Sequence, residues 1–378
     1  MPVDARRKIA VVLLNMGAPD RPAAVRPFLR NLFRDPAILR VGPFLRPFLA
    51  RLLARVRLRP AERNYALIKG RSPLLEITRA QAIGLAHELQ ELSVRSFVVM
   101  RYWHPFSEAA ARAVQAWHPD QVVLLPLYPQ YCSATSGSSL VAWREAAVRA
   151  GLIAETLSVC CFGLQRGYIR ALAASVRAGH VEASAALSAG TRLRVLFSAH
   201  GLPVSVITSG DPYQWHVEQT VGAVLSEWGN ADVDWIICYQ SRATPQQWLK
   251  PSTSEEIERA GREGVAVLVV PIAFVSDHSE TLVELDVEYR DLAEQVGLPG
   301  YFRVPALNVM PEFLRALAEI VRQAHRRAPG TVSDLGHRVC PQSFRLCPCA
   351  LADDDCDLGH DDSPLGVCAM AAEVSRGP

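Results

Sequence analysis

The chain has 378 residues, of which 49% are hydrophobic and 21% charged, and its formal net charge is +2. This length and composition are typical of a globular protein with one large or two modest domains. The small net charge gives no indication of a nucleic-acid partner. No apolar run reaches the roughly 18 residues of a membrane span.

The first apolar run, residues 9–15, follows a short charged segment and so resembles the start of a signal peptide. However, the run is short and β-branched, and it ends in a turn with Gly17 and Pro19 rather than a small-residue cleavage site. We therefore expect a buried first strand and a cytoplasmic protein.

Further apolar runs with the composition of strands alternate with helical patterns. The expected strands are residues 9–15, 96–102, 121–128, 194–199, 234–240 and 265–274, and two expected helices are residues 74–92 and 107–117. Because the strands are continuously apolar and helices separate them, the pattern predicts parallel sheets that are covered on both faces.

A weak internal repeat divides this α/β pattern into two parts. Residues 13–19 (LLNMGAP) resemble 196–203 (LFSAHGLP), and residues 122–138 resemble 267–281, in the same order. The repeat predicts two similar doubly wound halves, residues 1–165 and 166–328, with a cleft at the carboxyl ends of their strands. The alternative is a chance likeness between two α/β units.

Two segments lie outside this pattern. Residues 28–60 are apolar and arginine-rich, with almost no acid. They form either an ordinary amphipathic helix pair or an exposed lip that contacts lipid head groups or a flat apolar ligand with acidic substituents. Residues 329–378 form a C-terminal extension, and we expect its end, from Asp353 onward, to be poorly ordered.

Residues 271–290, PIAFVSDHSETLVELDVEYR, begin as a buried strand and continue as a row of carboxylates. On an α-helix, Glu280, Glu284 and Glu288 would share one face, where like charges repel. A solvated acidic face is one interpretation. Because the row starts with Asp277 and His278 directly after an apolar strand, the other is a line that passes protons or a hydrated divalent cation to a cleft.

His200 ends another expected strand, in FSAHGLP, directly before a Gly turn. Aligning Gly17 with Gly201 in the repeat sets Met16 opposite His200. A lone histidine is often structural, but at the cleft end of a strand it could take a proton from a substrate near neutral pH. The chain has no phosphate loop, GxGxxG or nucleophile elbow, so the nucleotide enzymes of this architecture are disfavoured.

Six motifs resemble those of ferrochelatases, in the order of that family and between about residues 8 and 325. They are LLNMGAP, MRYWHPF, LYPQYCSATSGSS, FSAHGLPVS, YQSRATPQQWLKPST and PIAFVSDHSETLVELDVEY. The resemblance implies two flavodoxin-like halves around a porphyrin cleft. It also implies insertion of Fe²⁺, as a substrate, into protoporphyrin IX to give protohaem, the last step of haem biosynthesis.

The same resemblance implies roles for individual residues. His200 and Glu280 would face each other across the macrocycle and handle pyrrole protons and the metal. The acidic line leading away from them would consist of Asp277, His278, Glu284 and Glu288. The expected porphyrin contacts are Met16, Arg57, Ser72, Arg101, Tyr102, Tyr128, Trp248 and Phe274. Among these, Ser72 and a basic residue near Arg57 would hold the propionates.

Four of the nine cysteines lie close together near the C-terminus: Cys340, Cys347, Cys349 and Cys356. Without an export signal, such a group suggests a metal. The first three resemble the triad of bacterial ferrochelatases that bind a [2Fe-2S] cluster, which needs four thiolates. The fourth would be Cys160 or Cys161, with Cys132 and Cys356 as alternatives. Structural zinc and free thiols are the other interpretations.

Other functions stay open from the sequence alone. A related chelatase could insert cobalt or nickel into a different tetrapyrrole, and a close relative could use coproporphyrin, which carries extra carboxylates. A non-catalytic haem or metal carrier would not need both His200 and Glu280 on facing walls. The enzyme could be a monomer or a homodimer, and its arginine-rich lip suggests peripheral membrane contact.

Overall fold

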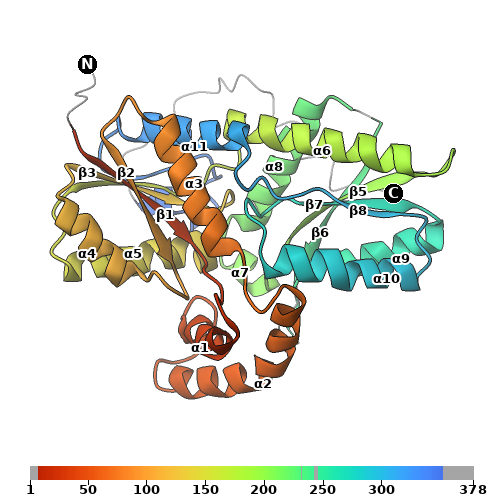
Figure 1. Ribbon diagram of the computed structural model, residues 1–378, viewed down its shortest axis with the longest axis horizontal. Coiled ribbons are helices and arrows are strands. Elements are labelled where there is room, and N and C mark those ends of the chain that lie inside the picture. The colour runs from red at the N-terminus through yellow and green to blue at the C-terminus, as the bar shows by residue number, and fades with distance from the viewer. Residues whose placement is uncertain (1–6, 231, 242–245, 352–378) are drawn as a thin grey trace.

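The computed structural model describes residues 7–230, 232–241 and 246–351. Its strands form two parallel sheets (Figure 1). The strands are β1 (Ile9–Asn15), β2 (Val94–Met100), β3 (Gln121–Pro126), β4 (Glu155–Val159), β5 (Leu193–His200), β6 (Asp234–Gln240), β7 (Ala266–Pro271), β8 (Tyr301–Arg303) and β9 (Gly330–Val332).

The two sheets share one topology. The first has the order β2-β1-β3-β4-β9, and the second has the order β6-β5-β7-β8. The first order is that of flavodoxin-like folds, with β9 as the last strand, and the second reproduces its first four positions. The prediction of two similar doubly wound α/β halves is therefore confirmed.

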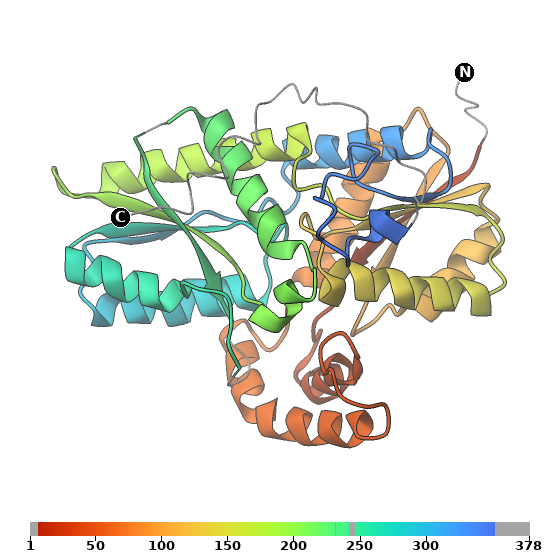
Figure 2. The same cartoon turned by 180° about the vertical axis from the view of Figure 1, so that it is seen from behind.

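Helices cover both faces of the sheets (Figures 1 and 2). One face carries α3 (Leu74–Glu88), α6 (Arg166–Ala186), α8 (Tyr213–Trp228) and α11 (Pro311–Ala324). The opposite face carries α4 (Ser107–Trp117) and α5 (Ser138–Arg149) on the first sheet, and α9 (Thr253–Glu263) and α10 (Tyr289–Gln295) on the second. A single hydrophobic core runs under α3, α6, α8 and α11 across both sheets, so the halves pack as one unit.

Several elements end earlier than the sequence predicted. β2 ends at residue 100 rather than 102, β3 at 126 rather than 128, β7 at 271 rather than 274, and α3 at 88 rather than 92. β3 and β7 end at prolines, which have no N–H group for the sheet ladder. The residues beyond these strands, among them Arg101, Tyr128 and Phe274, therefore lie in loops at the carboxyl edge.

The row of glutamates does not lie on an α-helix. Residues Glu280–Glu288 form a π-helix, η3, and a second π-helix, η2 (Ser133–Gly137), stands at the equivalent place after β3. In a π-helix the hydrogen bonds run from i to i+5 and the turn is wider. Residues four apart therefore do not stack as predicted, and each glutamate reaches a different neighbour.

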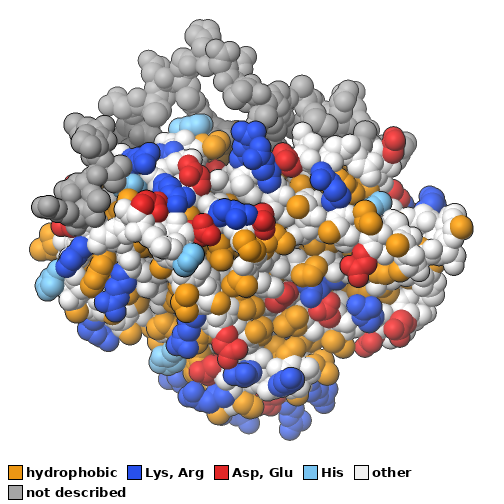
Figure 3. Space-filling model, turned by 45° about the horizontal axis from the view of Figure 1, so that its top comes forward, with side chains coloured by type: hydrophobic (Ala, Val, Ile, Leu, Met, Phe, Trp, Pro, Cys, Tyr) orange, Lys and Arg blue, Asp and Glu red, His pale blue; other side chains and the backbone are white. Residues whose placement is uncertain are grey.

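The lip projects from the carboxyl edge of the sheets (Figure 1). Here we define the lip as residues 28–60, which comprise most of α1 (Val25–Arg34) and of α2 (Arg46–Leu67), after a short turn, η1 (Pro22–Ala24). Phe44, Phe48 and Val56 are exposed on it. Basic and hydrophobic side chains crowd together on this protrusion at the lower end of Figure 3. No helix in the described ranges is long and apolar enough to cross a membrane.

The C-terminal extension joins the first half. β9 pairs in parallel with β4, from Leu157 opposite Gly330 to Val159 opposite Val332. The chain then continues to a short 3-10 helix, η4 (Pro348–Leu351). The prediction for Asp353 onward lies outside the described residues.

Candidate active site

A cleft opens at the carboxyl edges of both sheets and encloses about 950 Å³ of empty space, counted out to solvent. Most of its lining is apolar, and residues from both halves contribute. The lining residues are Asn15, Met16, Ile38, Leu74, Arg101, Tyr102, Leu127, Tyr128, Gln130, Cys132, Ala134, Thr135, Ser139, His200, Leu202, Tyr213, Ala273, Phe274, Val275, Ser276, His278 and Glu280. This mainly apolar lining, supplied by both halves, suits an apolar ligand that lies between them.

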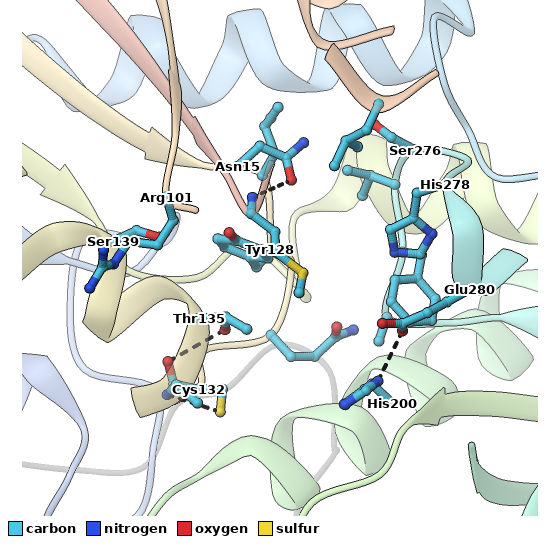
Figure 4. Close-up of a pocket in the computed structure, with 18 of the residues that line it drawn as sticks. Asn15, Arg101, Tyr128, Cys132, Thr135, Ser139, His200, Ser276, His278 and Glu280 are labelled. Carbon is cyan, nitrogen blue, oxygen red and sulfur yellow. Dashed lines mark hydrogen bonds and ion pairs between the residues drawn. The ribbon is translucent and has the colours of Figure 1, made fainter. Parts of the chain in front are cut away.

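His200 and Glu280 meet on one wall of the cleft (Figure 4), so the expectation that they face each other across it is wrong. His200 is the last residue of β5 and Glu280 the first of η3, and the Nδ1–Oε2 distance is 2.9 Å. The phenol of Tyr213 donates a hydrogen bond to the His200 carbonyl at 3.1 Å. The two side chains keep 36% and 24% of their surfaces exposed, so a bound molecule can reach them.

Mutual attraction decides the charge state of this pair. Burial alone would lower the pKa of His200, but the charge and hydrogen bond of Glu280 outweigh it and raise that pKa above 6.5. Burial would raise the pKa of Glu280, but His200 lowers it to about 2. The resting site therefore favours an imidazolium next to a carboxylate.

Replacing Glu280 with Gln is expected to lower the pKa of His200 below that of the wild type. The variant keeps the burial that disfavours the imidazolium and loses the carboxylate that favours it. In the wild type, the stability from His200 is present below about pH 6.5 and is lost as the pH rises through the raised folded-state pKa. NMR titration of the His200 ring would measure the change, and an unchanged or higher pKa would contradict this pairing.

His278 lies beside the pair in the same cleft (Figure 4). Its ring packs edge-on against Phe274, with 4.7 Å between ring centroids. Among the described residues its Nδ1 has no hydrogen-bond partner, and burial lowers its pKa. A neutral imidazole with a vacant nitrogen can bind a metal or accept a proton.

The other acidic residues of the row do not line the cleft. Asp277 accepts hydrogen bonds from Arg303 at 3.1 Å and from Asn308 at 2.7 Å. Glu284 accepts hydrogen bonds from Gln240 at 3.1 Å and from the Ser241 backbone at 2.9 Å. These partners occupy carboxylate oxygens that a metal would need, so neither residue presents a free carboxylate.

Glu288, at the far end of η3, accepts a hydrogen bond from Asn64 of α2 at 3.1 Å. Tyr65, the next residue of α2, lies 3.4 Å from Ser279 between their hydroxyl oxygens. The row of glutamates therefore begins in the cleft at Glu280 and ends against the lip helix.

The structure brings together most of the expected porphyrin contacts. Met16, Arg101, Tyr102, Tyr128 and Phe274 all line the cleft. The remaining three lie outside the lining: Ser72 is buried in the turn before α3, Arg57 is exposed on α2, and Trp248 packs against the Gly201 turn.

Asp35, which sequence reasoning missed, lies directly behind this wall. It is buried at the end of α1 and contacts both Arg101 and Tyr102. One signal was available, because Asp35 is the single acid in residues 28–60. An isolated acid in a basic, apolar segment indicates a carboxylate with a structural or functional partner.

The comparison with known families agrees with this geometry. The family model for ferrochelatase matches residues 8–325. The chain belongs to the ferrochelatase family. It is therefore an enzyme, a lyase that inserts iron into a porphyrin.

Curated relatives match over most of their length. The ferrochelatase of Caulobacter vibrioides is 49% identical over 331 residues, which cover 86% of this chain and 93% of the relative. That of Phenylobacterium zucineum is 46% identical over 341 residues, covering 88% and 96%. Among solved structures, SirB from Bacillus subtilis with Fe³⁺ matches with a TM-score of 0.48 and 13% identity, covering 84% of this chain and 95% of SirB.

Five cysteines of the enzyme gather in one buried group, which we call the cysteine cluster: Cys160, Cys161, Cys340, Cys347 and Cys349. Two of them directly follow β4, and three come from the extension. The Sγ of Cys160 lies 3.4 Å from that of Cys161 and 3.6 Å from that of Cys349. Hydrogen bonds from Cys340 and Cys349 lower the pKa of Cys347.

The alternative fourth ligands are not in this group. Cys132 lines the porphyrin cleft instead, and burial raises its thiol pKa. Cys356 lies outside the described residues. Among the described residues, no three His, Cys, Asp or Glu side chains converge as a single metal ion would require.

His216 on α8 connects the cysteine cluster with the cleft. Its Nδ1 accepts a hydrogen bond from the Tyr131 backbone at 3.0 Å, and its Nε2 lies 3.0 Å from the Sγ of Cys340. Because Nδ1 is an acceptor, the ring proton is on Nε2 and points toward the sulfur. The neighbours of Tyr131, Gln130 and Cys132, both line the cleft.

Proposed function

We propose that this ferrochelatase inserts Fe²⁺ into protoporphyrin IX to give protohaem, the last step of haem biosynthesis. The observation that carries the proposal is the His200–Glu280 pair on the wall of a large, mainly apolar cleft. An apolar cleft favours the porphyrin with fewer carboxylates, because each buried carboxylate needs a partner. Coproporphyrin, with coprohaem as product, is the second candidate.

The pair would act through proton and charge balance. Insertion replaces both pyrrole N–H protons with Fe²⁺, so the site must take up protons as the cation arrives. While His200 is an imidazolium it cannot accept a proton. A cation at Glu280 would compete with the imidazolium for the carboxylate and lower the pKa of His200. His200 would then release its proton and be free to accept one from the porphyrin.

The porphyrin would be held by the apolar and aromatic lining. Met16 from the first half and Phe274 from the second flank the cleft. Binding energy from such contacts can hold the macrocycle in a puckered form that exposes the nitrogen lone pairs. We assign Arg101, Tyr102 and Tyr128 to the same binding surface. Arg57, Ser72 and Trp248, outside the lining, would contact the propionates or the rim.

We also propose that η3 conducts protons to and from the cleft. Glu280 lies in the cleft, and Glu284 and Glu288 lead from it toward α2 and the lip. Burial, followed by repulsion from Glu280, raises the pKa of Glu284, which favours exchange of protons near this position. His278 stands beside Glu280 as a second acceptor. Asp277 would act indirectly, by holding the start of η3 through Arg303 and Asn308.

Anaerobic incubation of the purified enzyme with Fe²⁺ and each porphyrin tests the proposal. Loss of free-porphyrin fluorescence with protoporphyrin IX, faster than with coproporphyrin, is the expected result. Loss of fluorescence only with coproporphyrin would show that coproporphyrin, rather than protoporphyrin IX, is the substrate. Loss with neither, in correctly folded protein, would contradict the assigned chemistry.

We further propose that the cysteine cluster binds a [2Fe-2S] group through Cys160, Cys340, Cys347 and Cys349. Cys160 is favoured over Cys161 because its sulfur also contacts Cys349. When bound, the group would supply one-electron redox chemistry and a covalent tie between β4 and the extension. His216 would hold the Cys340 sulfur by its N–H, and the insertion step does not involve the cluster.

The lip supports a proposal of peripheral membrane contact by a cytoplasmic enzyme, either a monomer or a homodimer. α2 carries exposed apolar residues next to a series of arginines, which suits an interface with anionic lipid. This position would let an apolar product leave the cleft toward a membrane.

Replacing Phe44 and Phe48 together with Glu is expected to weaken binding to anionic vesicles by more than tenfold. Burying one Phe side chain contributes about 2 kcal/mol, and the new charges repel the lipid. Flotation with phosphatidylglycerol vesicles measures the effect. Ile153→Glu, at an exposed apolar residue of the first half away from the lip, is the matched control. Equal flotation of all three proteins would contradict lip binding.

A further inference from the structure

Arg101 is the only Lys or Arg among the described residues that line the cleft. Its guanidinium pairs with the carboxylate of Asp35, with 2.8 Å between Nη2 and Oδ2. The Asp35 side chain is only 2% exposed, whereas that of Arg101 is 24% exposed. Figure 4 shows Arg101 and Ser139 across the cleft from His200 and Glu280. The single basic side chain of this wall therefore meets the ligand with its charge already balanced.

Asp35 also joins three segments of the first half. The phenol of Tyr102 donates a hydrogen bond to Oδ2 at 2.8 Å, and the hydroxyl of Ser138 at the start of α5 donates to the same oxygen. The backbone N–H of Ala37, in the lip, donates to Oδ1 at 2.8 Å. Arg101 in turn donates from Nε to the Ser138 hydroxyl at 2.7 Å. The donors come from the loop after β2, from α5 and from the lip. The Asp35 carboxylate therefore holds these three segments of the cleft wall together.

The net charge of this wall has a consequence for the porphyrin. A carboxylate placed against it would lose water and find a guanidinium that is already bound to Asp35. A vinyl or methyl group at the same place needs no partner. If Asp35 were uncharged, Arg101 could offer a substrate carboxylate a charge-assisted hydrogen bond instead.

We propose that Asp35 is a specificity-determining residue that neutralises Arg101 and so selects a porphyrin whose edge at this wall carries no carboxylate. Asp35 acts through Arg101 and is a positioning residue. The inference rests on the proposed substrate, protoporphyrin IX, and explains how the enzyme would discriminate against coproporphyrin at this wall.

Asp35→Asn tests the proposal with metal-free porphyrins. Fluorescence quenching gives the Kd of each porphyrin, and the ratio of the coproporphyrin Kd to the protoporphyrin Kd is the readout. We expect this ratio to fall about tenfold in the variant, because Arg101 gains a carboxylate partner only with coproporphyrin. The double variant Asp35→Asn with Arg101→Gln removes both charges and is expected to restore the wild-type ratio.

The double variant distinguishes an effect of charge on the Kd ratio from an effect of shape. A ratio that stays low in the double variant would show that a change of shape, rather than of charge, moved the preference, and would overturn the proposal. If Asp35→Asn does not fold, Arg101→Gln alone decides. It leaves an unbalanced Asp35 behind the wall and should weaken coproporphyrin more than protoporphyrin, and equal weakening would overturn the role of Asp35.

The two levels of inference fail in different ways. Preference of the wild-type enzyme for coproporphyrin would overturn the proposed substrate and the selection together. Preference for protoporphyrin with an unchanged ratio in folded Asp35→Asn would overturn only the role of Asp35. Circular dichroism and thermal unfolding of each variant establish that the compared proteins are folded.

Discussion

Replacing His200 with Ala is expected to lower kcat by about 10²–10⁴-fold and to change porphyrin affinity little. The same result is expected for Glu280→Ala. These side chains form one pair on a single wall, and most of the cleft that would hold the macrocycle is built from other residues. Anaerobic Fe²⁺ insertion measures turnover, and quenching of metal-free porphyrin measures binding.

A matched control separates chemistry from stability. His325→Ala removes a buried histidine at the end of α11, which does not line the cleft. It should keep turnover even where it lowers the melting temperature. Because His200 and Glu280 act as a pair, the double variant should lose little more than either single variant. Full activity in both single variants would refute the mechanism.

If the proposed iron–sulfur group is bound, replacing Cys160 with Ser is expected to remove it and to lower the free energy of unfolding by about 4 kcal/mol, as loss of a structural metal does. The bond network would no longer tie the end of β4 to the extension. Iron and acid-labile sulfide content, together with denaturant unfolding under anaerobic conditions, measure the two effects.

Two other substitutions of the same kind test the assignment. Cys161→Ser should keep iron and sulfide, because the sulfur of Cys160, rather than that of Cys161, contacts Cys349 of the extension. Cys238→Ser, in the core of the second sheet, controls for the cost of a buried hydroxyl. Loss of iron in Cys161→Ser but not in Cys160→Ser would show that Cys161, rather than Cys160, is the fourth thiolate ligand. Zinc in the wild-type protein, without iron, would contradict the proposed [2Fe-2S] group.

The sequence predicted the fold because its information was local. Continuous apolar runs, with helices between them, leave a parallel sheet as the arrangement that buries them. In that arrangement the carboxyl ends of β1 and β5, which lie in separate sheets, both border the cleft, so Met16 and His200 could be placed there. The alternation of strand and helix patterns, repeated in the same order, predicted the two similar halves.

The partners of individual side chains were less accessible. Asp277 resembles a metal ligand in its motif, but the residues that occupy it, Arg303 and Asn308, lie 26 and 31 positions away. Asp35 meets Ser138 across 103 positions. No spacing rule connects residues so far apart, and only the folded chain shows which carboxylates are already satisfied.

The π-helix could not be predicted from the sequence either. A four-residue spacing of glutamates is compatible with an α-helix or a π-helix, and the two differ only in which carbonyl each N–H finds. The cysteine cluster was partly predictable, because the C-terminal motif identified its three cysteines from the extension. The approach of Cys160 to Cys349, 189 positions away, needed the structure.

The pairing of β9 with β4 has a consequence for how the enzyme is made. Val159 finds its partner, Val332, only after roughly 170 further residues have been translated, on the order of ten to thirty seconds at typical rates of synthesis. Until then the first sheet has an open edge at β4, which invites wrong pairing. The strand made almost last therefore completes the sheet begun first, and the nascent first half cannot reach its final form on the ribosome ahead of the second.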